Sequence, residues 1–506
     1  MSNCQIGPFR TEVLTPVVRS VKEWPDRPAF CIDDTFFSYN DFGRCVSKIR
    51  AEVQSAKPQN AKVGLVINDD LETYASIVAL WLEGCCYVPL HPKWPVERCL
   101  DIIGQVGMEL ILDSSDETQY QQYEVIKTES LTYSQDFLDA NCETPDDALA
   151  YILFTSGSTG KPKGVQLSRG NVAAFMDSFW KTGINLNEED RCLQCFDLTF
   201  DVSVQGYLAA LTRGACVYTV PYGQKKYLYV AGLIDEYKLT FGAMAPSMLR
   251  YMRPYFSEID ASSLRYCILT AEACPLDLME ELYQFAPNVE LYDFYGPTEG
   301  TIYVTYYKLS RTSPNKSLNG IVSIGRPLAN VSAIIIDEDG NLLPVGEKGE
   351  LCVAGSQITP GYWKNEEKNA SSFFYKTLDG GNEQRFYHTG DLCYRDDEGD
   401  IMYSGRLDHQ AKIQGFRVEM GEIEYHARGF LSGRNVACLA FENSIGVTEI
   451  AMFVESEQFD TSGLLSHMRT KMPSYMIPTK IFFVGTFPLN ANDKVDKNAL
   501  KIMIKS

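Results

Sequence analysis

Residues 153–165 read LFTSGSTGKPKGV, the apolar end of a strand-like run followed by a loop dense in Gly, Ser, Thr and Lys. The loop differs from the P-loop of nucleotide triphosphatases, which has four residues between its glycines and a Ser or Thr after its lysine. Here two residues separate Gly157 from Gly160, and Pro162 follows Lys161. Backbone N–H groups beside two glycines can still form an anion-binding nest. The hydroxyls and lysines around them favour a phosphate-binding loop over a flexible linker.

The length and charge of the chain limit the kind of protein it encodes. With 506 residues it is too long for one compact core, so two or more domains are expected. A net charge of -20 argues against nonspecific binding to nucleic acid or to an anionic membrane. The sequence contains neither an apolar run long enough for a membrane span nor a secretory signal pattern, so we expect a cytoplasmic protein.

The 15 cysteines show no disulfide framework. Because the chain has no export signal, we expect them to be reduced. Cys192 and Cys195 form a CxxC pair, but a zinc site there needs a second pair or a His pair at suitable spacing, and we find neither. We therefore expect buried core cysteines at this pair and at the adjacent Cys85 and Cys86.

The order of apolar runs predicts an α/β fold. Residues 62–68 and 149–155 read as buried strands, and helix-length stretches such as residues 72–86 lie between such runs. Strands that alternate with helices indicate largely parallel sheets. Beyond residue 330, short strands joined by turns such as DEDGN predict a small antiparallel barrel or sheet. About a hundred residues of mixed helix and strand pattern follow, a normal size for a small domain.

The opening loop and several later motifs closely resemble the adenylate-forming (ANL) superfamily. This superfamily includes acyl-CoA synthetases, luciferases and the adenylation domains of nonribosomal peptide synthetases. The resemblance covers nearly the whole chain, because the further motifs follow in the family's order. They are WLEGCCYVPLHPKWP (81–95), FYGPTEGT (294–301), GELCVAGSQITPGYWKN (349–365), FYHTGDL (386–392), GRLDHQAKIQGFRVEMGEIE (405–424) and NANDKVDKNAL (490–500).

The resemblance implies that the chain activates a carboxylate with ATP. In the family the carboxylate attacks the α-phosphate, giving an acyl-adenylate and pyrophosphate, so charge on the phosphoryl oxygens must be stabilised. Glu299 is implied as the Mg²⁺ ligand, because a hard cation suits a carboxylate beside phosphate oxygens. Thr298 is implied as an α-phosphate contact and Lys494 as the catalytic lysine. The family usually has Gly before that lysine, whereas this chain has Asp493.

The same resemblance implies further nucleotide contacts. Tyr295 is expected to stack on adenine, and Asp293 to contact the adenine edge. Asp391 is expected to accept both ribose hydroxyls, which suits an ionised carboxylate, and Arg406 to assist there. The expected phosphate-loop contacts are Thr155, Ser156, Gly157, Ser158, Thr159, Gly160, Lys161 and Lys163.

For the domain organisation, the resemblance implies a large N-terminal domain, residues 1–403, of two α/β subdomains with parallel-type sheets plus a small β-barrel. A hinge in residues 404–408, centred on Asp408, joins it to a small mobile α+β C-terminal domain, residues 409–506. That domain is expected to act as a lid that carries the catalytic lysine and rotates between two half-reactions.

The segment FDLTFDVSVQGYLAAL (196–211) indicates the class of substrate. It resembles the amino-acid-activating motif of the family, with Asp201 at the position that pairs with the substrate α-ammonium. Asp197 is the alternative, because the FD pair occurs twice, but the residues after Asp201 match the motif better. The side-chain pocket implied by the resemblance comprises Val202, Gln205, Ser247, Ile268, Thr270, Phe294, Ile302 and Tyr303.

These residues predict a small to medium substrate, polar or an imino acid such as proline. A basic side chain is disfavoured, because the pocket set holds no acidic residue beyond Asp201. Since no carrier or condensation segment is recognised, we expect a free-standing enzyme that loads a phosphopantetheinylated carrier protein in trans, similar to D-alanine–carrier protein ligases. An acyl-CoA synthetase and an inactive nucleotide-binding paralogue remain the alternatives.

Overall fold

The computed structural model describes residues 7–58, 61–129, 139, 143–157, 160–378, 381–408, 410–488 and 495–505. Contacts divide the chain into two units. The larger unit comprises residues 1–92, 106–153 and 164–407, and the smaller comprises residues 93–105, 154–163 and 408–506. The division into residues 1–403 and 409–506 stays a prediction.

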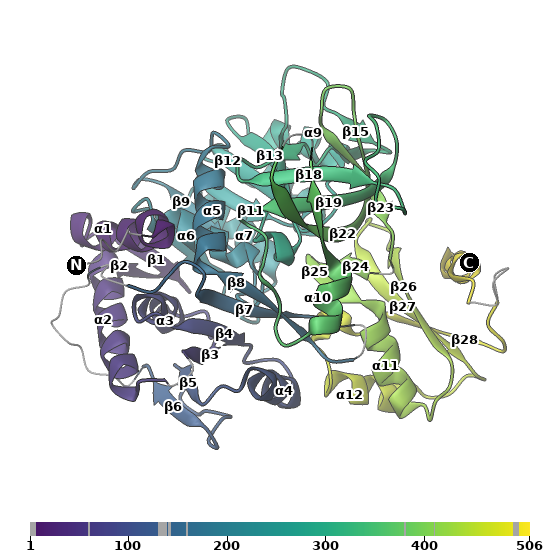
Figure 1. The fold of residues 1–506 in the computed structure, drawn as a ribbon, viewed down its shortest axis with the longest axis horizontal. Helices are drawn as coiled ribbons and strands as arrows, with labels where there is room; N and C mark the ends of the chain where they lie inside the picture. The colour runs from purple at the N-terminus through teal and green to yellow at the C-terminus, as the bar shows by residue number, and fades with distance from the viewer. Residues whose placement is uncertain are drawn as a thin grey trace. The chain divides into compact units, whose positions relative to one another are not determined.

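A nine-stranded sheet forms one part of the larger unit (Figure 1). Its inner strands run parallel, and antiparallel strands occupy both edges. In spatial order they are β17 (Arg326–Pro327), β14 (Thr305–Lys308), β13 (Glu290–Tyr295), β12 (Tyr266–Thr270), β11 (Phe241–Met244), β9 (Arg191–Gln194), β10 (Cys216–Thr219), β1 (Pro28–Ile32) and β2 (Thr35–Ser38).

A seven-stranded sheet is also built mainly from parallel pairs. Its strands, in spatial order, are β20 (Gly361–Tyr362), β8 (Lys163–Ser168), β7 (Leu149–Thr155), β4 (Cys86–Leu90), β3 (Lys62–Val66), β5 (Leu110–Asp113) and β6 (Glu124–Lys127). One hydrophobic core joins side chains of both large sheets to helices between them. The expected α/β class with parallel sheets is therefore confirmed.

Helix α3 (Leu71–Leu82) shows why these helices are central. Its sequence LETYASIVALWL is apolar around nearly the whole circumference, and such a helix is stable only when it is buried on all sides. Asp70 starts the helix by accepting the Thr73 N–H at 2.8 Å. The other helical segments of the larger unit are η1 (Arg10–Leu14), α1 (Thr15–Glu23), α2 (Tyr39–Ala56), α5 (Arg169–Trp180), α6 (Val202–Leu211), α7 (Lys226–Glu236), α8 (Pro246–Met252), η2 (Arg253–Glu258), α9 (Leu276–Phe285), η3 (Thr298–Gly300) and α10 (Glu366–Ser372).

A five-stranded antiparallel sheet follows, as the short strands and turns beyond residue 330 predict. It comprises β18 (Val331–Ile336), β19 (Gly349–Gly355), β22 (Glu383–Arg395) and β21 (Phe373–Thr377), with β23 (Ile401–Arg406) paired to β22. A short hairpin of β15 (Ser317–Leu318) and β16 (Ile321–Val322) precedes it.

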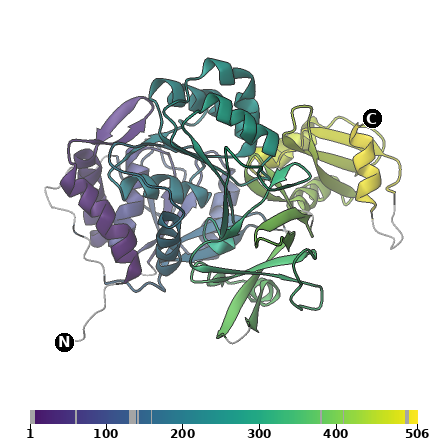
Figure 2. The same ribbon diagram turned by 90° about the horizontal axis from the view of Figure 1, so that it is seen from above.

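The smaller unit is α+β, as expected. It contains α4 (Val96–Val106) for most of its length, the hairpin β24 (Gln410–Ile413) with β25 (Phe416–Glu419), and the sheet β26 (Val436–Glu442), β27 (Thr448–Glu455) and β28 (Lys480–Val484). Its other helical segments are α11 (Met420–Phe430), α12 (Ser462–Arg469), η4 (Ser474–Met476) and α13 (Lys497–Lys505). Helix α13 lies against β26, at the yellow end of the chain in Figure 2.

Two further expectations from the sequence concern the cysteines and the possibility of a membrane-spanning helix. Each of the cysteines in the described part of the chain is buried, including the CxxC pair and the adjacent pair. None of the described helices combines the length and apolar character that crossing a bilayer requires.

Candidate functional site

Asp201 lies at the start of α6, next to the loop that follows β13. Every residue of α6 is buried, so the helix fixes the aspartate within the core rather than at the surface. The Asp201 side chain is 4% exposed, and its Oδ2 accepts the backbone N–H of Ile302 at 3.1 Å. A buried carboxylate is costly unless partners compensate it. This position therefore suits a group that recognises a cation.

Other predicted pocket residues surround this aspartate in the structure. The Tyr303 hydroxyl donates to Gln205 Oε1 at 3.5 Å, and the Tyr303 and Phe294 ring centroids lie 4.9 Å apart. Thr270 pairs in register with Phe294, because β12 and β13 are parallel neighbours. Val202 and Ile268 are buried in the same core. Residues from α6, β12, β13 and the following loop are thus brought together.

Ser247 differs from the sequence expectation in its partner. Its N–H and its hydroxyl both donate to the Glu272 carboxylate, each at 2.8 Å. Sequence reasoning missed this glutamate, which lies two residues beyond Thr270 at the end of β12. The predicted pocket set therefore has a second carboxylate beside it, and the argument against a basic substrate side chain loses its basis.

The loop after β13 has an unusual backbone that Gln357 supports. Thr301 and Ile302 have φ values of 59° and 71°, in the left-handed region that is unfavourable for a β-branched residue. The fully buried Gln357 amide donates to the Gly300 carbonyl at 3.3 Å and to the Tyr303 carbonyl at 2.7 Å. Sequence reasoning missed Gln357, although it lies within the quoted motif of residues 349–365.

Helix α5 holds Gln357 in place. Its first turn is closed by a capping box, in which Ser168 and Asn171 exchange hydrogen bonds. The Asn171 amide also donates to the carbonyls of Ser356 and Ile358, at 2.8 and 3.1 Å, on either side of Gln357. The start of α5 therefore holds Gln357, and Gln357 in turn holds the loop after β13.

Three predicted nucleotide residues form one hydrogen-bonded cluster. The Tyr295 hydroxyl donates to Asp391 Oδ2, and Arg406 Nη1 donates to Asp391 Oδ1 at 3.0 Å. Arg406 Nη1 also donates to the Thr389 carbonyl at 2.9 Å. Asp293 is buried on β13, two residues before Tyr295. The ribose and adenine residues expected from distant motifs are therefore neighbours.

Glu299 lies in η3 and is fully buried. The Tyr362 hydroxyl donates to its Oε1 at 2.6 Å, and its backbone carbonyl accepts the Thr359 N–H at 2.8 Å. A single buried carboxylate fits Mg²⁺ when phosphate oxygens and water complete the coordination. Thr298 begins the same short helix. Tyr362 is a further residue that sequence reasoning did not single out.

The segment 154–163 falls in the smaller unit, and three of its described residues, Ser156, Gly157 and Lys163, contact residues within 417–422. Ser156 Oγ donates to the Arg417 carbonyl at 2.9 Å and accepts the Glu419 N–H at 3.0 Å. Lys163 Nζ lies 3.6 Å from a Glu419 oxygen. These predicted phosphate ligands therefore have protein partners in this structure.

A carboxylate already occupies one donor of the expected anion nest. The Gly157 N–H donates to Glu422 Oε2 at 3.0 Å, and Arg98 Nη1 donates to the other oxygen, Oε1, at 2.6 Å. Both charged side chains are buried, Glu422 completely. The Gly157 N–H thus donates to a carboxylate of the same chain, and a phosphate must displace Glu422 to reach that N–H. The phosphate-binding nest stays a prediction.

The remaining site predictions lie at the edges of the described structure. Ser158, Thr159 and Lys494 fall outside the described residues. Thr155 ends β7, Gly160 has a φ of 78°, and Lys161 is exposed. The Asp408 carboxylate accepts the Gln410 N–H at 3.1 Å, as a turn residue does, and its hinge role stays a prediction.

Asp197, the alternative to Asp201, has a different environment. Its Oδ2 lies 2.8 Å from His91 Nε2, and its Oδ1 accepts the Thr199 N–H and hydroxyl. Burial raises the pKa of Asp197, but the hydrogen bond and charge of His91, together with Thr199, outweigh it and lower the pKa to about 2. Asp197 thus lies among close protein partners, and the preference for Asp201 as the residue that binds the substrate ammonium stays a prediction.

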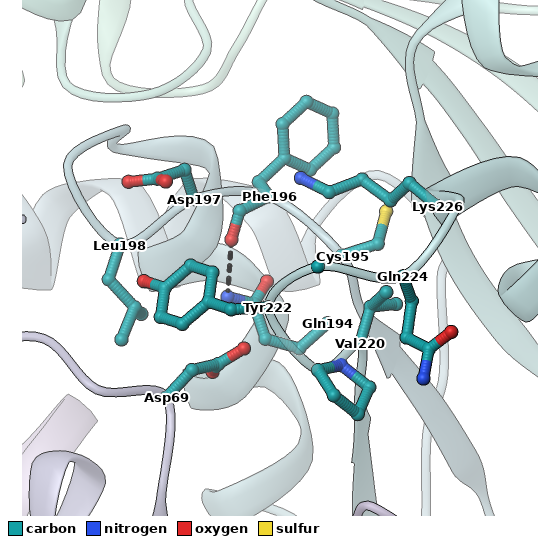
Figure 3. Close-up of a pocket in the computed structure, with 12 residues that line it drawn as sticks. Asp69, Gln194, Cys195, Phe196, Asp197, Leu198, Val220, Tyr222, Gln224 and Lys226 are labelled. Atoms are coloured by element: carbon teal, nitrogen blue, oxygen red, sulfur yellow. Dashed lines mark hydrogen bonds between the residues drawn. The ribbon is translucent and has the colours of Figure 1, made fainter. Parts of the chain in front are cut away.

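Asp197 also lines a separate pocket of about 70 Å³ (Figure 3). Figure 3 shows Asp69 and Asp197 on two sides of the Tyr222 ring, with Lys226 entering from a third side. Apart from Asp197, the alternative to Asp201, none of the predicted ATP or amino-acid residues lines this pocket. Its volume is less than half that of a cavity of roughly 150 Å³ that holds benzene, so it is too small for a nucleotide.

An α/β core with a buried carboxylate near aromatic side chains and a Tyr–Asp–Arg cluster fits an adenylate-forming type of enzyme. The family described as AMP-binding enzyme matches residues 17–363, and the chain belongs to this family.

Relatives and solved structures agree with this placement. One of the subunits of linear gramicidin synthase from Brevibacillus parabrevis is 32% identical over 493 residues, which cover 94% of this chain and 9% of that protein. The adenylation domain AlmE of Vibrio cholerae, in complex with glycyl-adenosine-5'-phosphate, has a TM-score of 0.85 at 25% identity, with 97% of each chain covered. An NRPS protein containing adenylation and PCP domains shares the fold, with a TM-score of 0.84 at 21% identity, covering 96% of this chain and 84% of that one.

We predict that Gln357→Met destabilises the protein by roughly 1–3 kcal/mol, because the loop carbonyls lose buried donors that methionine cannot replace. The urea midpoint of unfolding measures this loss. Gln166→Met is the matched control, since the Gln166 amide donates to the single carbonyl of Gly361, at 3.2 Å. Equal shifts for both variants would contradict the role of Gln357.

We predict that Asp69→Asn stabilises the protein above pH 7 and leaves it unchanged near pH 4. Burial, the largest effect, raises the pKa of Asp69 to about 7 although Tyr74 hydrogen-bonds to it. Between about pH 4 and pH 7 the folded protein therefore keeps a proton that the unfolded chain has lost, so stability falls as pH rises. The gain at pH 8 is up to about 4 kcal/mol. Asparagine tolerates the Asp69 φ of 60°.

Thermal unfolding of wild type and of Asp69→Asn across pH 4–8 measures the difference in stability between them. Asp116→Asn, at an exposed position, is the control. Curves for Asp69→Asn and wild type that stay parallel across this range would show that Asp69 does not retain a proton on folding.

Proposed function

We propose that this chain activates an amino acid with ATP as an aminoacyl-adenylate and transfers it to the phosphopantetheine thiol of a separate carrier protein. The observation that carries the proposal is the buried Asp201 carboxylate, placed at the start of α6 among the pocket side chains. A fatty or aryl acid offers no cation to pair with a buried carboxylate, whereas an amino acid does.

The relatives support an amino acid as substrate. The similar adenylation domain AlmE was solved with an aminoacyl-adenylate, glycyl-adenosine-5'-phosphate. The chain spans 9% of the matched linear gramicidin synthase polypeptide, so the similarity concerns one segment of that protein and not its whole activity. The neighbour that combines adenylation and PCP domains supports a carrier protein as the acceptor.

The described cluster can bind the nucleoside part of ATP. An ionised carboxylate has about four acceptor positions, so Asp391 can keep Arg406 and accept ribose hydroxyls in place of the Tyr295 hydroxyl. Tyr295 then offers its ring to adenine, and Asp293 can contact the adenine edge. Arg406 orients the carboxylate through its hydrogen bond to Oδ1.

Glu299 is the residue that we assign to Mg²⁺, which neutralises charge on the phosphates when bound. Tyr362 donates to one oxygen of this carboxylate and so fixes its orientation. Thr298 and the phosphate-loop residues Thr155 to Lys163 are assigned to the phosphates. Glu422 must leave the Gly157 N–H before that donor can serve them.

In the first half-reaction a substrate carboxylate oxygen forms a bond to the α-phosphorus, and the bond to the bridging oxygen of pyrophosphate breaks. Lys494 is assigned to the charge that the carboxylate and the α-phosphate share. In the second half-reaction the thiol sulfur bonds to the acyl carbon, AMP leaves, and the thiol proton passes to solvent. Rotation about Asp408 is proposed to exchange the groups that face the site between these steps.

Amino-acid-dependent ATP–pyrophosphate exchange tests the proposal. The panel comprises the L-amino acids, D-alanine, other D- and β-amino acids, and fatty and aryl acids. We expect exchange with one or a few small to medium amino acids. The acceptor is then identified by offering a phosphopantetheinylated carrier protein and, separately, coenzyme A. Exchange only with acids that lack an amine, followed by transfer to coenzyme A, would overturn the proposal in favour of an acyl-CoA synthetase.

We predict that Asp201→Asn raises the KM for the amino acid roughly 10- to 100-fold and leaves the KM for ATP nearly unchanged, because a charged hydrogen bond to the ammonium is lost. Asparagine still accepts the Ile302 N–H, so the loop is preserved. The decisive readout is the preference for the amino acid over its des-amino analogue, which should collapse. Asp197→Asn is the control, and loss of the preference in that variant alone would transfer the role to Asp197.

We predict that Lys494→Ala lowers the exchange rate by about a hundredfold or more, a loss typical of removing one group that stabilises developing charge. The matched control is Lys501→Ala, which removes an exposed lysine of α13. If Lys494→Ala exchanges pyrophosphate as fast as wild type, another residue performs this step.

A further inference from the structure

Three side chains capable of binding a metal share one face of the five-stranded sheet. Cys352 on β19 pairs directly with His388 on β22. Opposite residues of an antiparallel pair project to the same face, and residues two apart along a strand do so too. Glu350, two residues before Cys352, therefore joins them. The carboxylate, thiol and imidazole ligand atoms all lie within 4.8 Å of one another.

The sulfur–nitrogen distance fits a tetrahedral ion held between these side chains, and the nitrogen–oxygen distance is slightly shorter than such an ion requires. Zinc–sulfur and zinc–nitrogen bonds of about 2.3 and 2.05 Å at a tetrahedral angle place the two ligand atoms about 3.6 Å apart. Cys352 Sγ and His388 Nδ1 are 3.6 Å apart. His388 Nδ1 and Glu350 Oε2 are 2.8 Å apart, as in a hydrogen bond, and must separate by only about half an ångström for zinc to replace the shared proton.

The surroundings orient the ligands and leave one side open. The Gly390 N–H donates to Glu350 Oε1 at 2.9 Å, so Oε2 is left to face His388. The Phe374 ring lies 4.5 Å from the His388 ring and limits its rotation. Cys352 is fully buried, whereas the side chains of His388 and Glu350 are 33% and 20% exposed. An ion can therefore enter from solvent, and water can supply a fourth ligand.

The ligand set identifies the class of metal. One thiolate, one imidazole and one carboxylate suit zinc or a similar divalent transition metal, whereas magnesium and calcium take oxygen ligands. We propose that Glu350, Cys352 and His388 bind one zinc ion. The thiolate and the carboxylate together balance its two positive charges, so the site as a whole is neutral.

A cysteine binds a metal as its thiolate, so an ion at this site displaces the Cys352 proton to solvent. This site is separate from the CxxC pair of residues 192 and 195, for which no zinc ligands were expected.

Anaerobic titration of the full-length chain with Co²⁺ tests the proposal, because a bound thiolate gives a sulfur-to-cobalt charge-transfer band in the near ultraviolet. We expect the band to saturate at one equivalent and to disappear when Zn²⁺ displaces Co²⁺. Cys352→Ser should abolish it. His388→Asn and Glu350→Gln should each weaken binding roughly tenfold or more. Cys393→Ser is the matched control, since Cys393 is buried on β22 in a different cluster and should leave the band intact.

Absence of the band in wild type, or its survival in Cys352→Ser, would overturn the proposal. Circular dichroism establishes that each variant is folded. If the buried Cys352→Ser fails to fold, His388→Asn decides the question, because this partly exposed position tolerates substitution. Unchanged cobalt affinity in folded His388→Asn would then exclude the site.

Discussion

The hydrogen bond from the Ile302 N–H to the Asp201 carboxylate joins two parts of the site that lie a hundred residues apart in the chain. It fixes the start of α6 against the loop after β13. That loop has left-handed backbone at Thr301 and Ile302, a conformation that persists only where the surroundings enforce it. Gln357, held by the start of α5, provides this constraint from a third segment. Glu299 and Tyr303 lie on this loop, which begins directly after Tyr295 at the end of β13.

Much of the fold could be predicted from the sequence, because buried strands and apolar helices leave strong local patterns. The runs at 62–68 and 149–155 include β3 and β7, and residues 72–86 cover most of α3. These fold predictions rest on features that a short window of sequence contains. The structure also brings Tyr295, Asp391 and Arg406 together, and their roles at the nucleotide stay predictions from the family resemblance.

Residues that act across long sequence separations could not be found in this way. Gln357 acts on carbonyls more than fifty residues earlier in the chain, and nothing in its local pattern identifies it. Glu272 matters because it receives two hydrogen bonds from Ser247, a pairing that follows from neighbouring strands. The sequence favoured Asp201 over Asp197 by the residues that follow it, but it could not show that His91 pairs with Asp197.

The phosphate loop illustrates a third case, in which the sequence did not reveal a partner within the chain. Glycine spacing predicted N–H groups that donate to a phosphate, and in this structure the Gly157 N–H donates to an anion of the protein itself. The anion is the Glu422 carboxylate, which is itself paired with Arg98. A donor that suits phosphate also suits a carboxylate of the same chain, so the two compete for it.

The pairing of β19 with β22 has a consequence for how this sheet can change in evolution. Between Cys352 and Glu350 one residue of β19 faces three residues of β22, including Asp391, so β22 carries two extra residues. An even insertion keeps every other side chain on its original face, and Tyr387 and Cys393 on either side of it enter the same core cluster. Two residues of this bulge, residues 389–391, could therefore be gained or lost without repacking the sheet. Deletion of one residue would instead move the side chains on one side of the deletion to the opposite face of the sheet.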